Sequence, residues 1–490
     1  MQIYNYKKFQ FLDFLLCIFL IFNSIRDIYI IRKLGSKQIQ QKFLSSENLN
    51  QLITFILLFI TKYHYEGFKL SVILILLSFT NLQWLKYVQY QYISFCISYG
   101  LLLISLLYVL YKLPIYHFPE PLGSYQIGLK QMAIRDKFHT KVSVYYPCIF
   151  NEKSKKYTKW CQTENYQRSM HESMKYFPLV LPWLIFKIMT DFVQKVYVKN
   201  SPNAKIIQQE KKFKVIIFSH GLAGHRQSYS IFTNDLASKG YIVFSPDHYE
   251  DISPQELINA IKNKNDNNMN IVKQIRNQQL NDRQQQIAQL IKVIKNKQQM
   301  EELFESRISL DVENIVLMGH SFGGVTATQS AFLDKEIKAV IGLDPWLYPQ
   351  DDQLLDLKYK NPILYINTES FAIKNPQYQL IQKCQQIYQA AGDSQNNKII
   401  GFLKNSDHVS MTDICFIIPQ ESVLIQMIRQ TENLVEITQQ TRILVSLFLE
   451  KMVFGNQSKE QVLNEYEKNC VEMYIKIYMC RDGSMMDIFI

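Results

Sequence analysis

The sequence predicts an α/β fold, in which helices cover both faces of a mostly parallel β-sheet. Beyond about residue 113, short runs of β-branched and aromatic residues recur, and several are almost wholly apolar. Such runs are typical of parallel strands covered on both sides. Stretches of helical character separate them, including Ser228–Ser238 and Val325–Leu333. This alternation is the pattern of an open sheet between two helical layers.

Seven strands are predicted along this part of the chain. They are Lys141–Tyr146, Lys214–Phe218, Tyr241–Ser245, Asn314–Met318, Ala339–Leu343, Pro362–Asn367 and Lys398–Leu403. A Gln- and Lys-rich segment at 252–299 separates the third from the fourth. Its apolar residues Ile287, Leu290, Ile291 and Ile294 follow helical spacing, so we expect an amphipathic helix packed through one stripe. The segment has few aromatic residues between its basic ones that could stack on bases. This favours a crossover helix over a nucleic-acid-binding helix.

The first 112 residues differ from the rest in composition, because they contain long uncharged apolar stretches. Their uncharged stretches are Phe14–Ile25, Asn48–Thr61, Leu70–Leu85 and Tyr87–Tyr111. Only the last is long enough to span a bilayer unaided. We therefore predict a membrane-anchoring helical region over 1–112, with one transmembrane helix at about 88–111 and up to three more, the next at about 69–86. This predicts a multi-pass membrane protein; basic residues on both sides of the spans leave its orientation open.

Composition excludes several classes of protein. The chain has 490 residues and 47% hydrophobic residues, too many for a disordered chain. Lys+Arg 54 against Asp+Glu 43 gives a net charge of +11, a mild excess that does not demand nucleic acid. The eight cysteines form no CxxC or metal-ligand spacing. We expect no nucleic acid, metal or organic cofactor as a partner.

The chemistry is predicted at Ser321. The predicted strand Asn314–Met318 leads into Gly319-His320-Ser321-Phe322-Gly323 and then a helix-compatible stretch, which is the G-x-S-x-G nucleophile elbow in its strand–turn–helix context. The sharp turn crowds the serine against positions two before and two after it. Gly319 and Gly323 leave that space free. The sequence therefore predicts an α/β-hydrolase catalytic domain over 113–455, followed by a tail at 456–490 of unknown role.

A serine nucleophile needs a base, and in this fold the order along the chain is serine, acid, histidine. Of nine histidines, only His408 follows the elbow. Two carboxylates end predicted strands between them, Asp344 and Glu369, and position alone does not choose between them. Asp407 adjoins His408, but neighbouring side chains diverge, so it is a poor candidate.

The oxyanion hole should use backbone N–H groups. One is that of Phe322, directly after the nucleophile, and the other comes from a loop after an early strand. The loop Ser219-His220-Gly221-Leu222 fits, with Leu222 as the donor. We expect His220 and His225 to order this loop rather than to act in catalysis.

Several blocks together resemble the plasma-type platelet-activating-factor acetylhydrolase family. These blocks are FSHGL (218–222), NDLASKGYIV (234–243), GHSFGG (319–324), GLDPW (342–346) and ILYINTESF (363–371). The resemblance covers roughly residues 115–455. It implies a calcium-independent serine esterase that removes short or oxidised sn-2 acyl groups from phospholipids, with a triad of Ser321, Asp344 and His408 and oxyanion donors at Leu222 and Phe322.

The chain departs from that family pattern in two places. The histidine turn of the family resembles glycine-x-x-His, whereas here it reads Asn405-Ser406-Asp407-His408, so we expect an altered turn. Known plasma-type members are secreted, whereas this chain begins with apolar spans.

The resulting hypothesis is a membrane-anchored serine esterase that hydrolyses the sn-2 ester of a phospholipid through an acyl-enzyme on Ser321. Its partners would be a phospholipid or other lipid ester and the bilayer. A general carboxylesterase or lipase without phospholipid preference is the first alternative. A non-catalytic membrane scaffold with a hydrolase fold is the second.

Overall fold

A computed structural model describes most of the chain beyond residue 117. The described residues are 118–135, 137–149, 157–161, 196–222, 224–248, 266–351, 359–417, 434–469 and 475–476. The membrane-anchoring region predicted over 1–112 lies outside these residues, and so does the start of the 252–299 segment. None of the helices in the described ranges is both long enough and apolar enough to cross a membrane.

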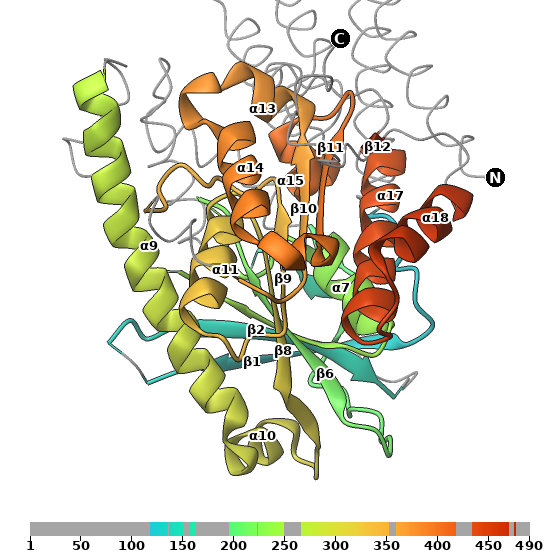
Figure 1. The fold of residues 1–490 in the computed structure, drawn as a ribbon. Coiled ribbons are helices and arrows are strands. Elements are labelled where there is room, and N and C mark those ends of the chain that lie inside the picture. The colour runs from blue at the N-terminus through green and yellow to red at the C-terminus, as the bar shows by residue number, and fades with distance from the viewer. Residues whose placement is uncertain are drawn as a thin grey trace, which may run out of the picture. The chain divides into compact units, whose positions relative to one another are not determined.

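A ten-stranded mixed sheet organises the described chain (Figure 1). Its strand order is β12-β11-β10-β9-β8-β6-β7-β2-β1-β5. The strands are β1 (Gln126–Ala133), β2 (Lys141–Cys148), β5 (Ser201–Pro202), β6 (Phe213–Ser219), β7 (Ile242–Pro246), β8 (Leu310–His320), β9 (Ala339–Leu343), β10 (Ile363–Thr368), β11 (Lys398–Leu403) and β12 (Ile475–Lys476). From β7 to β11 all neighbours are parallel, while β2 joins β7 and β1 in antiparallel pairs. The predicted α/β class with a mostly parallel sheet is confirmed.

The register of the central strands places their carboxyl ends at one edge of the sheet. Gly319 of β8 pairs with Ser219 of β6 and with Gly342 of β9, and Thr368 of β10 pairs with Leu403 of β11. In open parallel sheets this edge is where ligands bind. The segments that follow β6, β8, β9, β10 and β11 therefore meet there.

Helices cover both faces of the sheet. They are α7 (Ser230–Ser238), α9 (Asp266–Lys295), α10 (Lys297–Phe304), α11 (Phe322–Leu333), α13 (Glu369–Lys374), α14 (Leu380–Ala390), α15 (Ile414–Ile417), α17 (Leu434–Leu447) and α18 (Lys459–Asn469). Shorter turns are the 3-10 segments η4 (Pro376–Tyr378), η5 (Gly392–Asn397) and η6 (His408–Met411) and the π-helical η7 (Phe448–Val453). Two further strands, β3 (Thr158–Lys159) and β4 (Tyr197–Val198), form a separate antiparallel pair.

The alternation of side chains along the strands divides the core in two. Val215 and Ile217 of β6 pack in one cluster with α9, α11 and α14. Ile216 and Phe218 of the same strand pack in the other, with α7, α17 and α18. Both faces of the central strands are apolar because both are covered, which explains why their sequences lack polar alternation.

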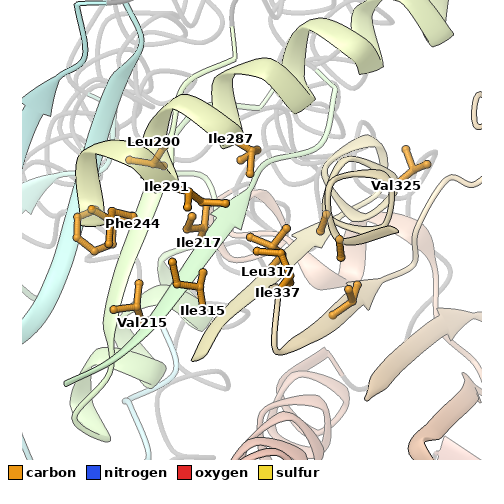
Figure 2. Packing of buried hydrophobic residues seen from close by; sticks show 14 of the residues in the cluster. Val215, Ile217, Phe244, Ile287, Leu290, Ile291, Ile315, Leu317, Val325 and Ile337 are labelled. Carbon is orange, nitrogen blue, oxygen red and sulfur yellow. The ribbon is translucent and has the colours of Figure 1, made fainter. Parts of the chain in front are cut away.

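The stripe predicted for the crossover helix packs on the first face (Figure 2). Ile287, Leu290, Ile291 and Ile294 of α9 are buried among residues of β6, β7 and β8. Each buried aliphatic side chain contributes roughly 1.5–3 kcal/mol relative to exposure. Burial of this stripe therefore fixes α9 against the sheet, although most of its other residues are polar.

The compact unit extends past residue 455, where the sequence predicted its end. Val462, Leu463 and Tyr466 of α18 are buried in the second cluster. Residues of β12 pair antiparallel with Phe402 and Leu403 of β11. The region predicted as a tail thus supplies a helix and an edge strand.

Candidate active site

Ser321 lies at the turn between β8 and α11. Its backbone φ is +56°, in the region that non-glycine residues rarely adopt. A Cβ added at Gly319 would lie 2.8 Å from Ser219 O, and one added at Gly323 would lie 2.6 Å from His220 O. Both separations are shorter than real Cβ contacts allow. The turn therefore depends on the two glycines that the sequence singled out.

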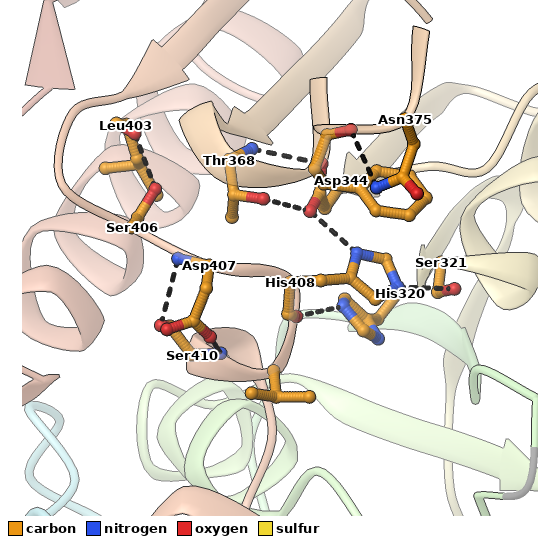
Figure 3. A network of polar contacts seen from close by, with 12 residues as sticks. His320, Ser321, Asp344, Thr368, Asn375, Leu403, Ser406, Asp407, His408 and Ser410 are labelled. Carbon is orange, nitrogen blue, oxygen red and sulfur yellow. Dashed lines mark hydrogen bonds and ion pairs between the residues drawn. The ribbon is translucent and has the colours of Figure 1, made fainter. Parts of the chain in front are cut away.

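His408 links Ser321 to Asp344 (Figure 3). Its Nε2 lies 2.8 Å from Ser321 Oγ, and its Nδ1 lies 2.7 Å from Asp344 Oδ2. An ionised carboxylate can only accept, so the proton of the neutral ring sits on Nδ1 and leaves Nε2 to accept from the serine hydroxyl. Ser321 is 8% exposed, which keeps the pair partly screened from water.

Asp344 is fixed by the neighbouring strand. It follows β9 with a φ of +47°, and its side chain is fully buried. Its Oδ1 accepts a 3.0 Å hydrogen bond from Thr368 N, and its Oδ2 accepts one from the Thr368 hydroxyl. The carboxylate is thus oriented by three donors, two from Thr368 and one from His408. Sequence reasoning missed Thr368, although a hydroxyl at the end of a strand beside a candidate acid is a usable signal.

Glu369, the alternative acid, is directed elsewhere. Its Oε2 accepts a 2.6 Å hydrogen bond from Asn405 N. Asn405 has a φ of +53° and occupies the position of the glycine in the resembled histidine turn. Asparagine tolerates this left-handed conformation better than most residues, so the turn forms despite the substitution. The geometry places Asp344, rather than Glu369, against His408.

The turn carrying His408 is held from several sides. Asp407 does not reach the imidazole but caps the turn, accepting from Ser410 N at 3.1 Å. Phe371 stacks on the His408 ring, with centroids 4.0 Å apart. His320 lies on the ring as well, at 4.6 Å. The stacked Phe371 and the tilted His320 ring together restrict the orientation of the imidazole, and sequence patterns gave no indication of either contact.

The predicted oxyanion loop passes directly against the nucleophile. A Cβ added at Gly221 would lie 3.2 Å from Ser321 Cβ. Within the described residues, neither the Leu222 nor the Phe322 amide donates a hydrogen bond. Phe322 begins α11, so its N–H also lies at the positive end of that helix. Both amides are thus available in the segments that flank Ser321.

Two histidines of this loop are neutral: His220 is buried and His225 is half-buried. Burial, with a smaller contribution from Arg283, lowers the pKa of His220 to about 4, and burial lowers the pKa of His225 to about 3. The His220 Nδ1 lies 2.7 Å from Gly221 O, and its Nε2 accepts from His248 N at 3.0 Å. His220 therefore connects the loop to His248, while His225 Nδ1 accepts a 3.1 Å hydrogen bond from Gln227 N. His248, which the sequence did not single out, takes part in the same network.

Chemically, this arrangement can move a proton between a serine hydroxyl and an imidazole held by a carboxylate. Among the residues that the structure describes, no group of three or more histidine, cysteine or acidic side chains could hold a metal ion.

Comparison with known proteins gives consistent matches. The family model for platelet-activating factor acetylhydrolase, isoform II, matches residues 112–467. A platelet-activating factor acetylhydrolase of Canis lupus familiaris is 28% identical over 325 residues, 61% of this chain and 68% of that protein. The Bos taurus protein of the same name is 29% identical over 280 residues, 52% of this chain and 60% of its own length.

Among solved structures, a ferulic acid esterase from Streptomyces cinnamoneus matches with a TM-score of 0.46 and 16% identity, covering 68% of this chain and 91% of that one.

The predicted activity class, hydrolysis of carboxylic esters, is confirmed by the family model and the curated relatives, as is the family resemblance. The chain belongs to the platelet-activating factor acetylhydrolase, isoform II, family.

Proposed function

We propose that the protein is a membrane-anchored serine esterase that cleaves the sn-2 acetyl or short acyl ester of phospholipids through an acyl-enzyme on Ser321. The observation that carries the proposal is the position of His408, within hydrogen-bond distance of both Ser321 Oγ and Asp344 Oδ2. This is the arrangement that nucleophilic ester cleavage requires.

The reaction proceeds in two halves. His408 Nε2 accepts the Ser321 proton while Oγ attacks the ester carbonyl, and the carbonyl oxygen becomes an anion that the Leu222 and Phe322 amides bind. Asp344 stabilises the imidazolium that forms. His408 then returns the proton to the leaving oxygen, which releases a lysophospholipid. Water activated by His408 next attacks the acyl-enzyme and frees the carboxylic acid.

The names of the family's members and the surroundings of the serine support the proposed substrate class. The curated relatives are named platelet-activating factor acetylhydrolases. Beside the serine, the rings of Phe322 and Trp346 lie 5.9 Å apart, and that of Trp346 lies 5.2 Å from Tyr378. Phe322 and Trp346 are buried, so the protein interior next to the serine is apolar and aromatic.

A substrate series tests the assignment. The full chain in detergent micelles should hydrolyse 2-acetyl phosphatidylcholine with a higher kcat/KM than the 2-palmitoyl analogue, and Ser321→Ala should abolish both activities. Hydrolysis of p-nitrophenyl esters without turnover of either phospholipid would instead support a general carboxylesterase.

Membrane anchoring is proposed from the apolar stretches within residues 1–112. A membrane-bound active site would meet a phospholipid that reaches it from the bilayer. Extraction of membranes with alkaline carbonate should leave the full chain in the pellet. Release of the chain into the supernatant would contradict anchoring by transmembrane helices and leave the esterase assignment intact.

A further inference from the structure

One peptide unit of the oxyanion loop is held at both of its polar atoms. The carbonyl oxygen of His220 accepts a 2.6 Å hydrogen bond from Arg283 Nη1. The N–H of the same unit, which belongs to Gly221, donates to Tyr229 Oη at 3.0 Å. The next residue is Leu222, whose N–H is the proposed oxyanion donor. These two hydrogen bonds fix the orientation of the His220–Gly221 peptide plane, which directly precedes the Leu222 amide.

Tyr229 also connects the oxyanion loop, through His320, to the turn that carries His408. Its hydroxyl accepts from Gly221 N, so its own proton is free to donate to His320 Nδ1 at 2.9 Å. His320 is then protonated on Nε2, which donates to the backbone oxygen of His408 at 2.9 Å (Figure 3). Burial, reinforced by the adjacent His408, holds the pKa of His320 well below its usual range, so the ring is neutral.

This continuous chain of bonds joins the oxyanion loop, the residue before the nucleophile and the turn that carries the base. All of its groups have compatible donor and acceptor roles. Tyr229 is 4% exposed and His320 is 3% exposed, so water does not compete readily for these bonds.

Arg283 contacts both segments that carry an oxyanion donor. It lies in the crossover helix α9 and is 1% exposed. Besides its bond to His220 O, its guanidinium carbon lies 4.6 Å from the centre of the Phe322 ring. Phe322 is the residue whose own N–H is the second proposed donor. One side chain from α9 thus touches the loop before Leu222 and the start of α11.

We propose that Arg283 and Tyr229 are positioning residues that set the relative placement of the Leu222 and Phe322 amides in the oxyanion hole. The inference rests on the proposed function. It also gives the long crossover helix a task beyond covering the sheet, because α9 carries the guanidinium to the loop.

Tyr229→Phe and Arg283→Lys test the inference in the full chain. The first removes one hydroxyl without changing the ring; the second keeps an amine donor on a long side chain but loses the planar guanidinium. Active sites are counted by titration with a fluorophosphonate, and p-nitrophenyl acetate is the substrate. We expect kcat and kcat/KM per titrated site to fall together by about 10- to 100-fold in Tyr229→Phe and by a smaller factor in Arg283→Lys.

Binding of a trifluoromethyl ketone, which mimics the tetrahedral intermediate, should weaken by the same factor as kcat/KM falls. Tyr146→Phe is the matched control, because its buried hydroxyl also donates one hydrogen bond, to Ala204 O at 2.7 Å, away from the site. It should leave kcat per site and ketone binding unchanged.

The outcomes separate the two proposals. Wild type that neither hydrolyses esters nor reacts with the fluorophosphonate would refute the proposed function and this inference with it. Active wild type with unchanged kcat per site and ketone binding in both variants would overturn the inference alone. A loss of titratable sites with normal kcat per site would also overturn it, because that pattern reports folding. If Tyr229→Phe yields no folded protein, Arg283→Lys decides by the same criteria.

Discussion

Replacing Gly323 by alanine should cost activity even though the change favours a helix. Alanine exceeds glycine in helix propensity by about 1 kcal/mol, and Gly323 lies in the first turn of α11. The added Cβ would nevertheless lie 2.6 Å from His220 O and closer still to Ser219 O, where ordinary contact begins near 3.4 Å. Relief of the closest of these contacts, with Ser219 O, requires the strand end or the helix to move by about 1.4 Å, and a misplacement of about 1 Å already costs on the order of 100-fold in rate.

Overpacking of this kind costs about 1–3 kcal/mol, which offsets or exceeds the gain in propensity. We expect kcat/KM for p-nitrophenyl acetate to fall about 100-fold, and urea unfolding to show a net loss of stability of up to about 2 kcal/mol. Gly392→Ala is the control: its Cβ meets nothing within 4 Å, but its φ of +51° strains an alanine. It should lose about 1 kcal/mol of stability and keep its activity. If Gly323→Ala retained kcat/KM within about threefold of wild type, the contact between turn and loop would not set the geometry of the site.

Three further predictions follow from particular side chains. Asp344→Asn should lower kcat about 10⁴-fold, because an amide facing Nδ1 favours the wrong tautomer of His408. The kcat of Glu369→Gln should stay within about threefold of wild type, because Glu369 bonds Asn405 N instead. Steady-state kinetics of both variants checks this. Asp413→Ala should lower the free energy of unfolding, measured by urea titration, by about 3 kcal/mol. The change removes a carboxylate that accepts hydrogen bonds from four buried donors: Trp160 Nε1, Ser230 N, Ser230 Oγ and Ile231 N. Burial lowers the pKa of Lys398 from 10.5 to about 7. Between these two pH values the unfolded chain binds more protons than the folded chain. The destabilisation caused by burying the charged lysine therefore decreases as pH rises and is gone above 10.5. The free energy of unfolding of wild type should therefore rise relative to Lys398→Met between pH 7 and 10, on the order of 2–4 kcal/mol; parallel slopes would refute this.

Two of the strands that end at the site were predicted from sequence with their observed bounds. Ala339–Leu343 and Lys398–Leu403 coincide with β9 and β11, because both are apolar runs buried on both faces. By contrast, β1 was not predicted. Its sequence, QIGLKQMA, contains a glycine and a lysine, and the buried Lys130 pairs with the exposed Glu305, 175 residues along the chain. A compensation between residues so distant in sequence leaves no local signal.

For the site, chain order alone identified His408, but it could not separate Asp344 from Glu369. Both residues end adjacent parallel strands, and the difference lies in the backbone directions beyond those ends. Asp344 turns at a φ of +47°, while Glu369 begins α13. Arg283 was hidden for another reason, because it lies in a helix whose composition resembles a solvated surface. Its burial depends on a tertiary contact with the loop after β6.

The most direct measurement is the mass-spectrometric mapping of the covalent adduct that the full chain forms with a fluorophosphonate, made alongside esterase assays. We expect one adduct, on Ser321, with esterase activity lost in proportion to labelling and no labelling in Ser321→Ala. An adduct on a different residue, or ester hydrolysis that persists in Ser321→Ala, would contradict catalysis by Ser321.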